Sequence, residues 1–128
     1  MKAKIGINGL GRIGRMVLRS IFEEKRKNLK IKHINNRTDI ISASELIKRD
    51  SIHGKFKGKV SVENDKLIIN GNKITYSQET NLSSISWKKY NVDIVFECTG
   101  KFNSKDKLIS HIKNGAKKVI VSAPCKSA

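Results

Sequence analysis

The stretch AKIGINGLGRIG, residues 3–14, decides the fold of this chain. A short apolar run, Ala3–Asn8, leads into three glycines, and a helical pattern begins inside the glycine motif. In this strand–turn–helix context, Gly9 permits a tight turn, Gly11 lets the backbone approach a pyrophosphate, and Gly14 lets the helix pack against the strand. The first N–H groups of the helix would face the phosphates. The motif therefore predicts a dinucleotide site; the alternative is a glycine-rich turn without a ligand.

The rest of the chain alternates between strand and helix patterns. Apolar residues at helical spacing predict helices, and short, nearly unbroken apolar runs predict buried strands. The expected helices are Arg12 to about Lys25, Ser42–Asp50 and Ser104–Asn114, and the further expected strands are Lys30–Asn35, Asn91–Thr99 and Lys117–Ser122. Strands of this kind that alternate with helices form a parallel sheet covered on both faces.

Two local signals mark helix ends. Ser42, followed three residues later by Glu45, predicts a capping box at the start of the second helix. Gly115 comes directly after the last helical pattern and is the candidate for its C-cap.

The hydrophobic periodicity of the sequence changes between about Phe56 and Ser77. Apolar and polar residues alternate there with period two, and turn residues separate the runs at Glu63–Asp65 and Asn70–Asn72. This segment is predicted to form an antiparallel hairpin. The whole pattern favours one α/β domain with a mostly parallel sheet, helices on both faces, and the hairpin as an insertion.

The chain carries a large excess of positive charge. Its 128 residues include 27 Lys and Arg against 11 Asp and Glu, a formal net charge of +16. The basic residues are spread along the sequence, which predicts a lysine-rich surface with non-specific affinity for polyanions. Nucleic-acid binding as the main role is disfavoured, because base-reading motifs and interleaved aromatic residues are missing.

Composition argues against several other classes of protein. No apolar run reaches the roughly 18 residues of a membrane-spanning helix, and a glycine-rich turn interrupts the first apolar stretch, unlike a signal peptide. We therefore expect a cytoplasmic protein. Cys98 and Cys125 are too few for a disulfide framework, and His33, His53 and His111 are scattered without metal-ligand spacing. No metal site is expected.

The sequence lacks the acid that usually accompanies this glycine motif. About 20 residues after the glycines, an Asp or Glu takes the ribose hydroxyls of NAD. Here the second strand ends in Asn35–Asn36, followed by Arg37. Asn36 has no charge to exclude a 2′-phosphate, and Arg37 offers a planar cation to bind one. We expect NADP to be accepted at least as well as NAD; the alternative is that Arg37 faces solvent.

Four motifs recur in a fixed order along the chain. They are NGLGRIGR at 8–15, DSIHGKFKGKV at 50–60, VDIVFECTGKF at 92–102 and GAKKVIVSAP at 115–124. In this order and spacing they closely resemble the N-terminal half of the phosphorylating glyceraldehyde-3-phosphate dehydrogenases. The sequence departs from the family pattern at Leu10, where the family usually has Phe.

The resemblance implies a Rossmann-type cofactor domain, residues 1–128, that binds NAD or NADP. It implies an oxidoreductase of glycolysis, in which a cysteine attacks the aldehyde, hydride passes to the nicotinamide, and phosphate releases an acyl phosphate. The family's catalytic cysteine and histidine belong to segments beyond Ala128, so we expect this chain alone to be inactive. The implied partners are the dinucleotide, the catalytic domain, and further copies of the protein in a homotetramer.

The resemblance also implies roles for individual residues. Family positions match at the turn (Asn8), the pyrophosphate (Arg12, Ile13), the ribose-binding acid (Asn36), the adenine side (Thr99, Gly100, Phe102) and the nicotinamide ribose (Ser122). Thr80 falls near the place of an arginine that often contacts the adenine. The expected cofactor-binding residues are Asn8, Gly9, Gly11, Arg12, Ile13, Gly14, Asn36, Arg37, Thr80, Thr99, Gly100, Phe102 and Ser122.

Two other interpretations stay open. One is a non-catalytic module that binds a dinucleotide, or RNA through its basic surface. The other is the cofactor domain of a related dehydrogenase for another phosphorylated aldehyde, such as erythrose 4-phosphate. Neither Cys98 nor Cys125 has a neighbouring base in the sequence that would make it a nucleophile, and His53 is interpreted as structural.

Overall fold

The computed structural model describes residues 3–23, 28–50, 54–55, 58–81, 84–99 and 105–121. Its strands are β1 (Ala3–Asn8), β2 (Leu29–Asn35), β3 (Arg49–Asp50), β4 (Gly54–Lys55), β5 (Val60–Glu63), β6 (Lys66–Ile69), β7 (Asn72–Ser77), β8 (Ile94–Glu97) and β9 (Lys118–Val121). Its helices are α1 (Arg12–Glu23), α2 (Ile40–Lys48) and α3 (Lys105–Lys113). Residues 24–25, 56–57, 104 and 122 of the expected elements lie outside the described residues.

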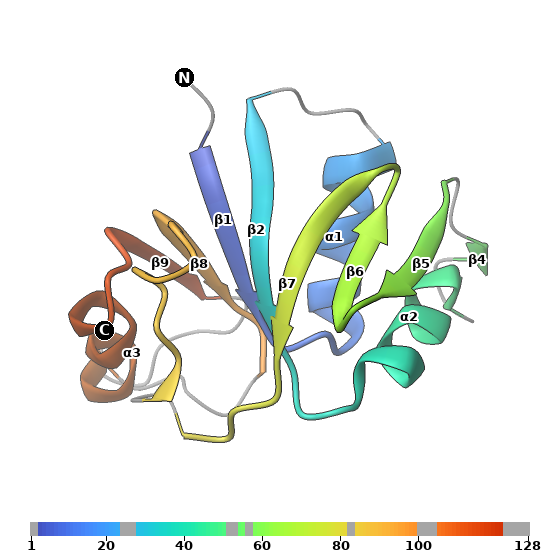
Figure 1. Cartoon of the computed structure of the whole chain (residues 1–128). Coiled ribbons are helices and arrows are strands. Elements are labelled where there is room, and N and C mark those ends of the chain that lie inside the picture. The colour runs from blue at the N-terminus through green and yellow to red at the C-terminus, as the bar shows by residue number, and fades with distance from the viewer. Residues whose placement is uncertain are drawn as a thin grey trace.

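A mostly parallel sheet forms the centre of the molecule (Figure 1). Its strand order is β5-β6-β7-β2-β1-β8-β9, and β3 and β4 form a separate pair. The pairs β7–β2, β2–β1, β1–β8 and β8–β9 are parallel, whereas β5–β6 and β6–β7 are antiparallel. The predicted α/β class and the predicted mostly parallel sheet are confirmed.

Successive side chains of the central strands point to two different layers. Ile5 and Ile7 of β1 pack in one buried cluster with Leu18 of α1 and with Ile47 of α2. We call this side of the sheet the α1 face. The opposite side, which we call the Trp87 face, is covered by the segment around Trp87 and by α3. Helices therefore cover both faces, as the sequence predicts.

A β-bulge in β2 adjusts which side chains reach each face. Ile5 pairs with Ile31, but the next residue of β1, Gly6, pairs with His33, so Lys32 is the extra residue. The bulge places His33 on the Trp87 face and lets Ile34 return to the cluster that contains Ile31. Simple alternation would have placed Ile31 and Ile34 on opposite faces.

The predicted hairpin is present and extends the parallel sheet. Asn64 and Asp65 have φ of 50° and 61°, and Asn70 and Gly71 have φ of 51° and 84°, so two residues close each turn. Positive φ at both central residues matches the right-handed twist of the flanking strands. The third strand of this segment, β7, then pairs parallel with β2.

The expected start and end of the second helix are wrong. Asp39 is the N-cap residue of α2, and its carboxylate accepts hydrogen bonds from the backbone N and Oγ of Ser42, each at 2.9 Å. These bonds hold the pKa of Asp39 below its usual value. Glu45 does not close a capping box and instead pairs with Lys48 at 3.4 Å. The helix ends at Lys48, because Arg49–Asp50 forms strand β3.

Positive φ at two turn residues bounds the C-terminal elements. Gly115 has φ of 114°, and its amide donates to the carbonyl of Ile112 at 3.1 Å, which confirms the predicted C-cap. The strand expected over Asn91–Thr99 is shorter, Ile94–Glu97, since Asn91 has φ of 60° and closes a turn after Trp87. Among the described residues, no helix is long and apolar enough to cross a membrane.

The contact between Gly6 and Trp87 yields a test of the packing. A Cβ atom on Gly6 would lie 2.5 Å from Trp87 Cζ3 and 3.0 Å from Val92 Cγ1. We expect Gly6→Ala to lower the free energy of unfolding by about 1–3 kcal/mol through overpacking. Urea denaturation followed by the fluorescence of Trp87, the single tryptophan, measures the loss. An unchanged unfolding midpoint would contradict this packing.

Candidate cofactor-binding site

The site begins at the turn where β1 ends. Gly9 has φ of 99°, and its amide donates to the carbonyl of Asn35 at 2.7 Å. A Cβ atom on Gly9 would lie 2.9 Å from Thr99 Cγ2, so a side chain here would be strained and also crowded. The tight turn expected at Gly9 is present.

The other two glycines of the motif differ sharply in their surroundings. A Cβ atom on Gly14 would lie 2.0 Å from the carbonyl oxygen of Gly9, so the first turn of α1 packs directly on the β1–α1 turn. Gly11 is exposed, and no neighbouring atom of the described residues would lie within 4 Å of a Cβ there. Gly14 thus serves packing, whereas Gly11 leaves room for a ligand to approach the backbone.

Two side chains hold the turn from either side. Leu10 donates its backbone N–H to Asn36 Oδ1 at 3.0 Å, and Arg15 Nη1 donates to the carbonyl of Leu10 at 2.8 Å. The helix bond from Arg15 N to the carbonyl of Gly11, at 2.9 Å, is the first of α1. The N–H groups of residues 12–14 precede it, cannot bond within the helix, and form its positive end.

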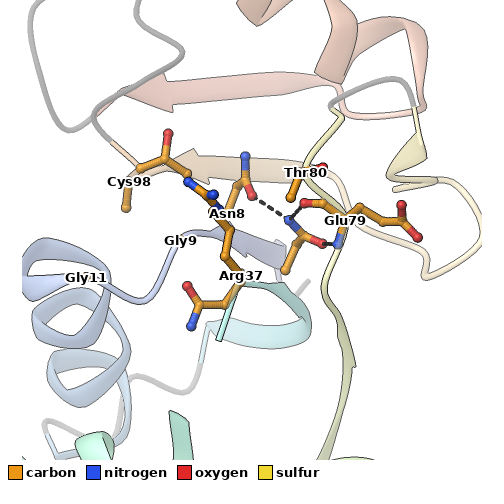
Figure 2. Close-up of a pocket in the computed structure, with 10 residues that line it drawn as sticks. Asn8, Gly9, Gly11, Arg37, Glu79, Thr80 and Cys98 are labelled. Carbon is orange, nitrogen blue, oxygen red and sulfur yellow. Dashed lines mark hydrogen bonds between the residues drawn. The ribbon is translucent and has the colours of Figure 1, made fainter. Parts of the chain in front are cut away.

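A pocket of about 390 Å³ opens beside this turn (Figure 2). It lies at the carboxyl ends of β1, β2 and β8 and at the loop that follows β7. Its lining residues are Asn8, Gly9, Gly11, Asn35, Asn36, Arg37, Glu79, Thr80, Cys98 and Thr99. From β1 the chain continues to β2 on one side and later to β8 on the other. Ligands of open α/β sheets bind at such a switch point.

The structure brings most of the expected site residues to this pocket. Seven of them line it: Asn8, Gly9, Gly11, Asn36, Arg37, Thr80 and Thr99. Arg12, Ile13 and Gly14 start α1 next to the pocket without lining it. Gly100, Phe102 and Ser122 lie outside the described residues.

Sequence reasoning missed three lining residues: Asn35, Glu79 and Cys98. Asn35 Nδ2 donates to Asn8 Oδ1 and to the carbonyl of Glu79, and Asn35 Oδ1 accepts from the amide of Glu79, all at 2.9 Å. Asn35 therefore ties the loop after β7 to β1. Its place at the end of a predicted strand, next to Asn36, was the available signal. Cys98 is buried beside Gly14, as a small apolar residue would be.

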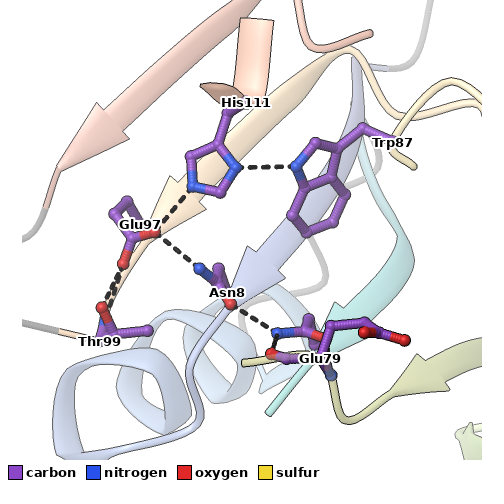
Figure 3. A network of polar contacts seen from close by, with 7 residues as sticks. Asn8, Glu79, Trp87, Glu97, Thr99 and His111 are labelled. Carbon is purple, nitrogen blue, oxygen red and sulfur yellow. Dashed lines mark hydrogen bonds and ion pairs between the residues drawn. The ribbon is translucent and has the colours of Figure 1, made fainter. Parts of the chain in front are cut away.

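A buried carboxylate lies behind the pocket wall (Figure 3). Glu97 Oε1 accepts from Asn8 Nδ2 and contacts His111 Nε2, each at 2.7 Å. Glu97 Oε2 accepts from the amide and hydroxyl of Thr99 at 3.0 and 2.6 Å. Trp87 Nε1 donates to His111 Nδ1 at 2.9 Å. Two strand ends and α3 thus meet at one carboxylate.

The hydrogen-bond pattern assigns the proton of His111. The indole N–H of Trp87 can only donate, so Nδ1 of His111 must accept and carries no proton. Nε2 then carries the proton and donates to Glu97. His111 is therefore neutral, and its contact with Glu97 is a hydrogen bond that Nε2 donates to the carboxylate oxygen.

His33 continues the polar layer on the Trp87 face. Its ring stacks on Tyr90 with centroids 3.7 Å apart, and its nitrogens lie 2.8 Å from Ser77 Oγ and 2.6 Å from Thr75 Oγ1. Burial, and then the positive charge of Lys89, lower the pKa of His33 from 6.5 to about 4. The ring is neutral at physiological pH.

A glycine turn packed against α1, a helix N-terminus and a pocket at the switch point define a dinucleotide-binding domain of the Rossmann type. The family model described as glyceraldehyde 3-phosphate dehydrogenase, NAD binding domain, matches residues 3–105. The chain belongs to this family.

Curated relatives agree with this assignment. The chain is 46% identical over 125 residues to the plasmid-encoded glyceraldehyde-3-phosphate dehydrogenase of Cupriavidus necator, covering 97% of this chain and 37% of that protein. It is 44% identical to the Thermotoga maritima enzyme over 97% of the chain and 37% of the enzyme. It is 41% identical to the cytosolic Trypanosoma brucei brucei enzyme over 98% of the chain and 37% of the enzyme. The chain thus spans little more than a third of these relatives.

Gly14 and Gly11 provide a matched pair of alanine variants. We expect Gly14→Ala to disrupt the start of α1 and lower stability by several kcal/mol, because its Cβ would clash with a backbone oxygen. Gly11→Ala should change stability by less than about 1 kcal/mol yet weaken NAD binding. Chemical denaturation and calorimetric titration measure the two effects. Equal stability of the two variants would show that the close contact is not required.

The low pKa of His33 predicts an acid-sensitive fold. The folded pKa of about 4 lies below the ordinary 6.5, so the unfolded chain binds a proton at His33 more readily than the folded chain does. The free energy of unfolding is therefore undiminished above pH 6.5 and decreases as the pH falls toward 4. The loss amounts to about 3 kcal/mol. An NMR titration of the His33 ring should give a midpoint near 4, and His33→Gln should flatten the dependence of stability on pH in this window. A midpoint near 6.5 would refute the assignment.

Proposed function

We propose that this chain is the NAD(P)-binding domain, residues 1–128, of an enzyme that oxidises and phosphorylates glyceraldehyde 3-phosphate. The observation that carries the proposal is the open backbone at Gly11, which faces a pocket at the switch point of the sheet. The family assignment supports it.

The chain's own residues bind and orient the dinucleotide in this proposal. The turn at Gly9–Gly11 and the first N–H groups of α1, at Arg12 and Ile13, hold the pyrophosphate. Asn36 and Arg37 lie toward the ribose of the adenosine half, and Thr80 and Thr99 toward the adenine. Asn8 supports the turn. By resemblance, Gly100 and Phe102 belong with the adenine side and Ser122 with the nicotinamide ribose.

In this proposal, the remaining chemistry belongs to groups outside these 128 residues. When bound, the nicotinamide accepts the hydride from the substrate. The catalytic cysteine and histidine of the family, supplied by a catalytic domain, would act on the aldehyde, and the complete enzyme would assemble as a homotetramer. We place the enzyme in the cytoplasm, in keeping with the relative that is named as cytosolic.

We further propose that the site accepts NADP at least as well as NAD. Asn36 Oδ1 accepts a hydrogen bond from the backbone N–H of Leu10. The Asn36 side chain also bonds to Tyr76, whose pKa is raised by burial and lowered in part by this hydrogen bond. Asn36 therefore acts as a neutral brace for the turn and brings no negative charge to the pocket. Arg37, beside it, is exposed and lines the pocket, where its guanidinium suits a 2′-phosphate.

Titration of NAD and NADP into the wild type and three variants tests both dinucleotide binding and the acceptance of NADP. Asn36→Asp keeps an acceptor for Leu10 but adds a negative charge, so NADP affinity should fall more than NAD affinity. Arg37→Ala should weaken NADP by about tenfold or more, since a charged hydrogen bond is worth about 1.5–3 kcal/mol, and leave NAD nearly unchanged.

Arg49→Ala is the control for the loss of one positive charge. Arg49 is 82% exposed and does not line the pocket, so both affinities should stay the same. Strong NAD preference in the wild type, unchanged by Asn36→Asp, would show that the missing acid does not set the choice. Failure of the wild type to bind either dinucleotide would refute the function itself.

A further inference from the structure

Glu97 is a buried anion without a cationic partner among the described ion pairs. Its side chain is 1% exposed, and its neighbour His111, which is fully buried, is neutral for the reason given above. A buried carboxylate of this kind is stable only when donors satisfy its oxygens. Four donors do so here, two on each oxygen.

Three of the four donors belong to residues that line the pocket. Asn8 supplies its Nδ2, and Thr99 supplies both its backbone N–H and its hydroxyl. Thr99 Cγ2 in turn lies against Gly9, where an added Cβ would be only 2.9 Å away. The carboxylate thus sets the distance between the end of β8 and the glycine turn.

We propose that Glu97 is a positioning residue for dinucleotide binding. From behind the pocket wall, it holds Asn8 and Thr99 in place. This role rests on the proposed function. His111, oriented by Trp87, keeps the carboxylate in place and cannot accept a proton on Nδ1 without losing the indole hydrogen bond. Because the hydroxyl proton of Thr99 is directed at Glu97, Thr99 Oγ1 can serve a ligand only as an acceptor.

An amide at position 97 cannot replace the carboxylate. A glutamine has one acceptor oxygen and one NH₂ group, so one pair of donors would face another donor. The backbone N–H of Thr99 can only donate, and rotating the Asn8 amide would turn its Nδ2 toward Asn35 Nδ2, which is also a donor. At least one of the two wall residues must therefore move.

The test compares affinity for NAD with stability. We expect Glu97→Gln to weaken calorimetric NAD binding by about tenfold or more, the range for hydrogen bonds to charged groups, and to shift the amide proton resonance of Thr99. Val95→Ala is the matched structural control, because Val95 is fully buried on the same strand and face but does not line the pocket. It should lower stability and leave NAD affinity within about twofold of wild type.

A second pair of variants keeps the test decisive if Glu97→Gln does not fold. His111→Gln can still donate to Glu97 and accept from Trp87, whereas His111→Leu can do neither. The leucine variant should weaken NAD binding severalfold, and the glutamine variant should restore it. Wild-type affinity in Glu97→Gln, or in His111→Leu when Glu97→Gln does not fold, would overturn the role of Glu97 alone. Absence of NAD binding by the wild type would overturn the proposed function and this role together.

Discussion

The close contact between Gly14 of α1 and the carbonyl oxygen of Gly9 is the constraint on which the rest of the structure depends. An added Cβ would lie 2.0 Å from that oxygen, so only glycine lets the helix start where it does. From this start, Leu18 and Ile21 fall over the apolar face of β1. The same start directs the first N–H groups of α1 to the carboxyl end of the sheet. The packing of the core and the geometry of the site therefore both depend on where α1 begins.

The two faces of the sheet differ in chemistry. The α1 face is filled almost wholly by aliphatic side chains. The Trp87 face carries His33, Asn35, Glu97 and His111, which are buried and bonded to one another or to neighbouring polar groups. Buried polar groups are tolerated only when they are satisfied in this way, and such networks favour one arrangement. This polar face ends at the pocket.

In the proposed site, Asn36 affects both the glycine turn and the charge of the pocket. The amide braces the glycine turn through Leu10, a task that a carboxylate oxygen would also perform. The charge, however, differs, and charge rather than shape discriminates a ribose hydroxyl from a 2′-phosphate. The turn can therefore keep its hydrogen bond with either residue, and in our proposal the preference between NAD and NADP responds to the charge.

Much of the architecture follows from local sequence features. The glycine spacing in residues 3–14 predicts the strand–turn–helix unit, and Asn and Gly at positive φ predict the hairpin turns, because these preferences belong to the residues themselves. Seven of the expected site residues line the pocket because parallel strands end at one edge. The capping box at Ser42 fails, since Asp39, three residues earlier, offers a better acceptor for the same N–H group.

Only the tertiary structure decided which distant residues meet. Asn8 and Glu97 are 89 positions apart, and no periodicity links them to His111 or Trp87. The β-bulge at Lys32 also has no local signature, because it arises from the register between β1 and β2. Periodicity reports which face of an element is apolar, but not which partner lies across it. The buried carboxylate behind the pocket therefore became visible only once the strands were paired.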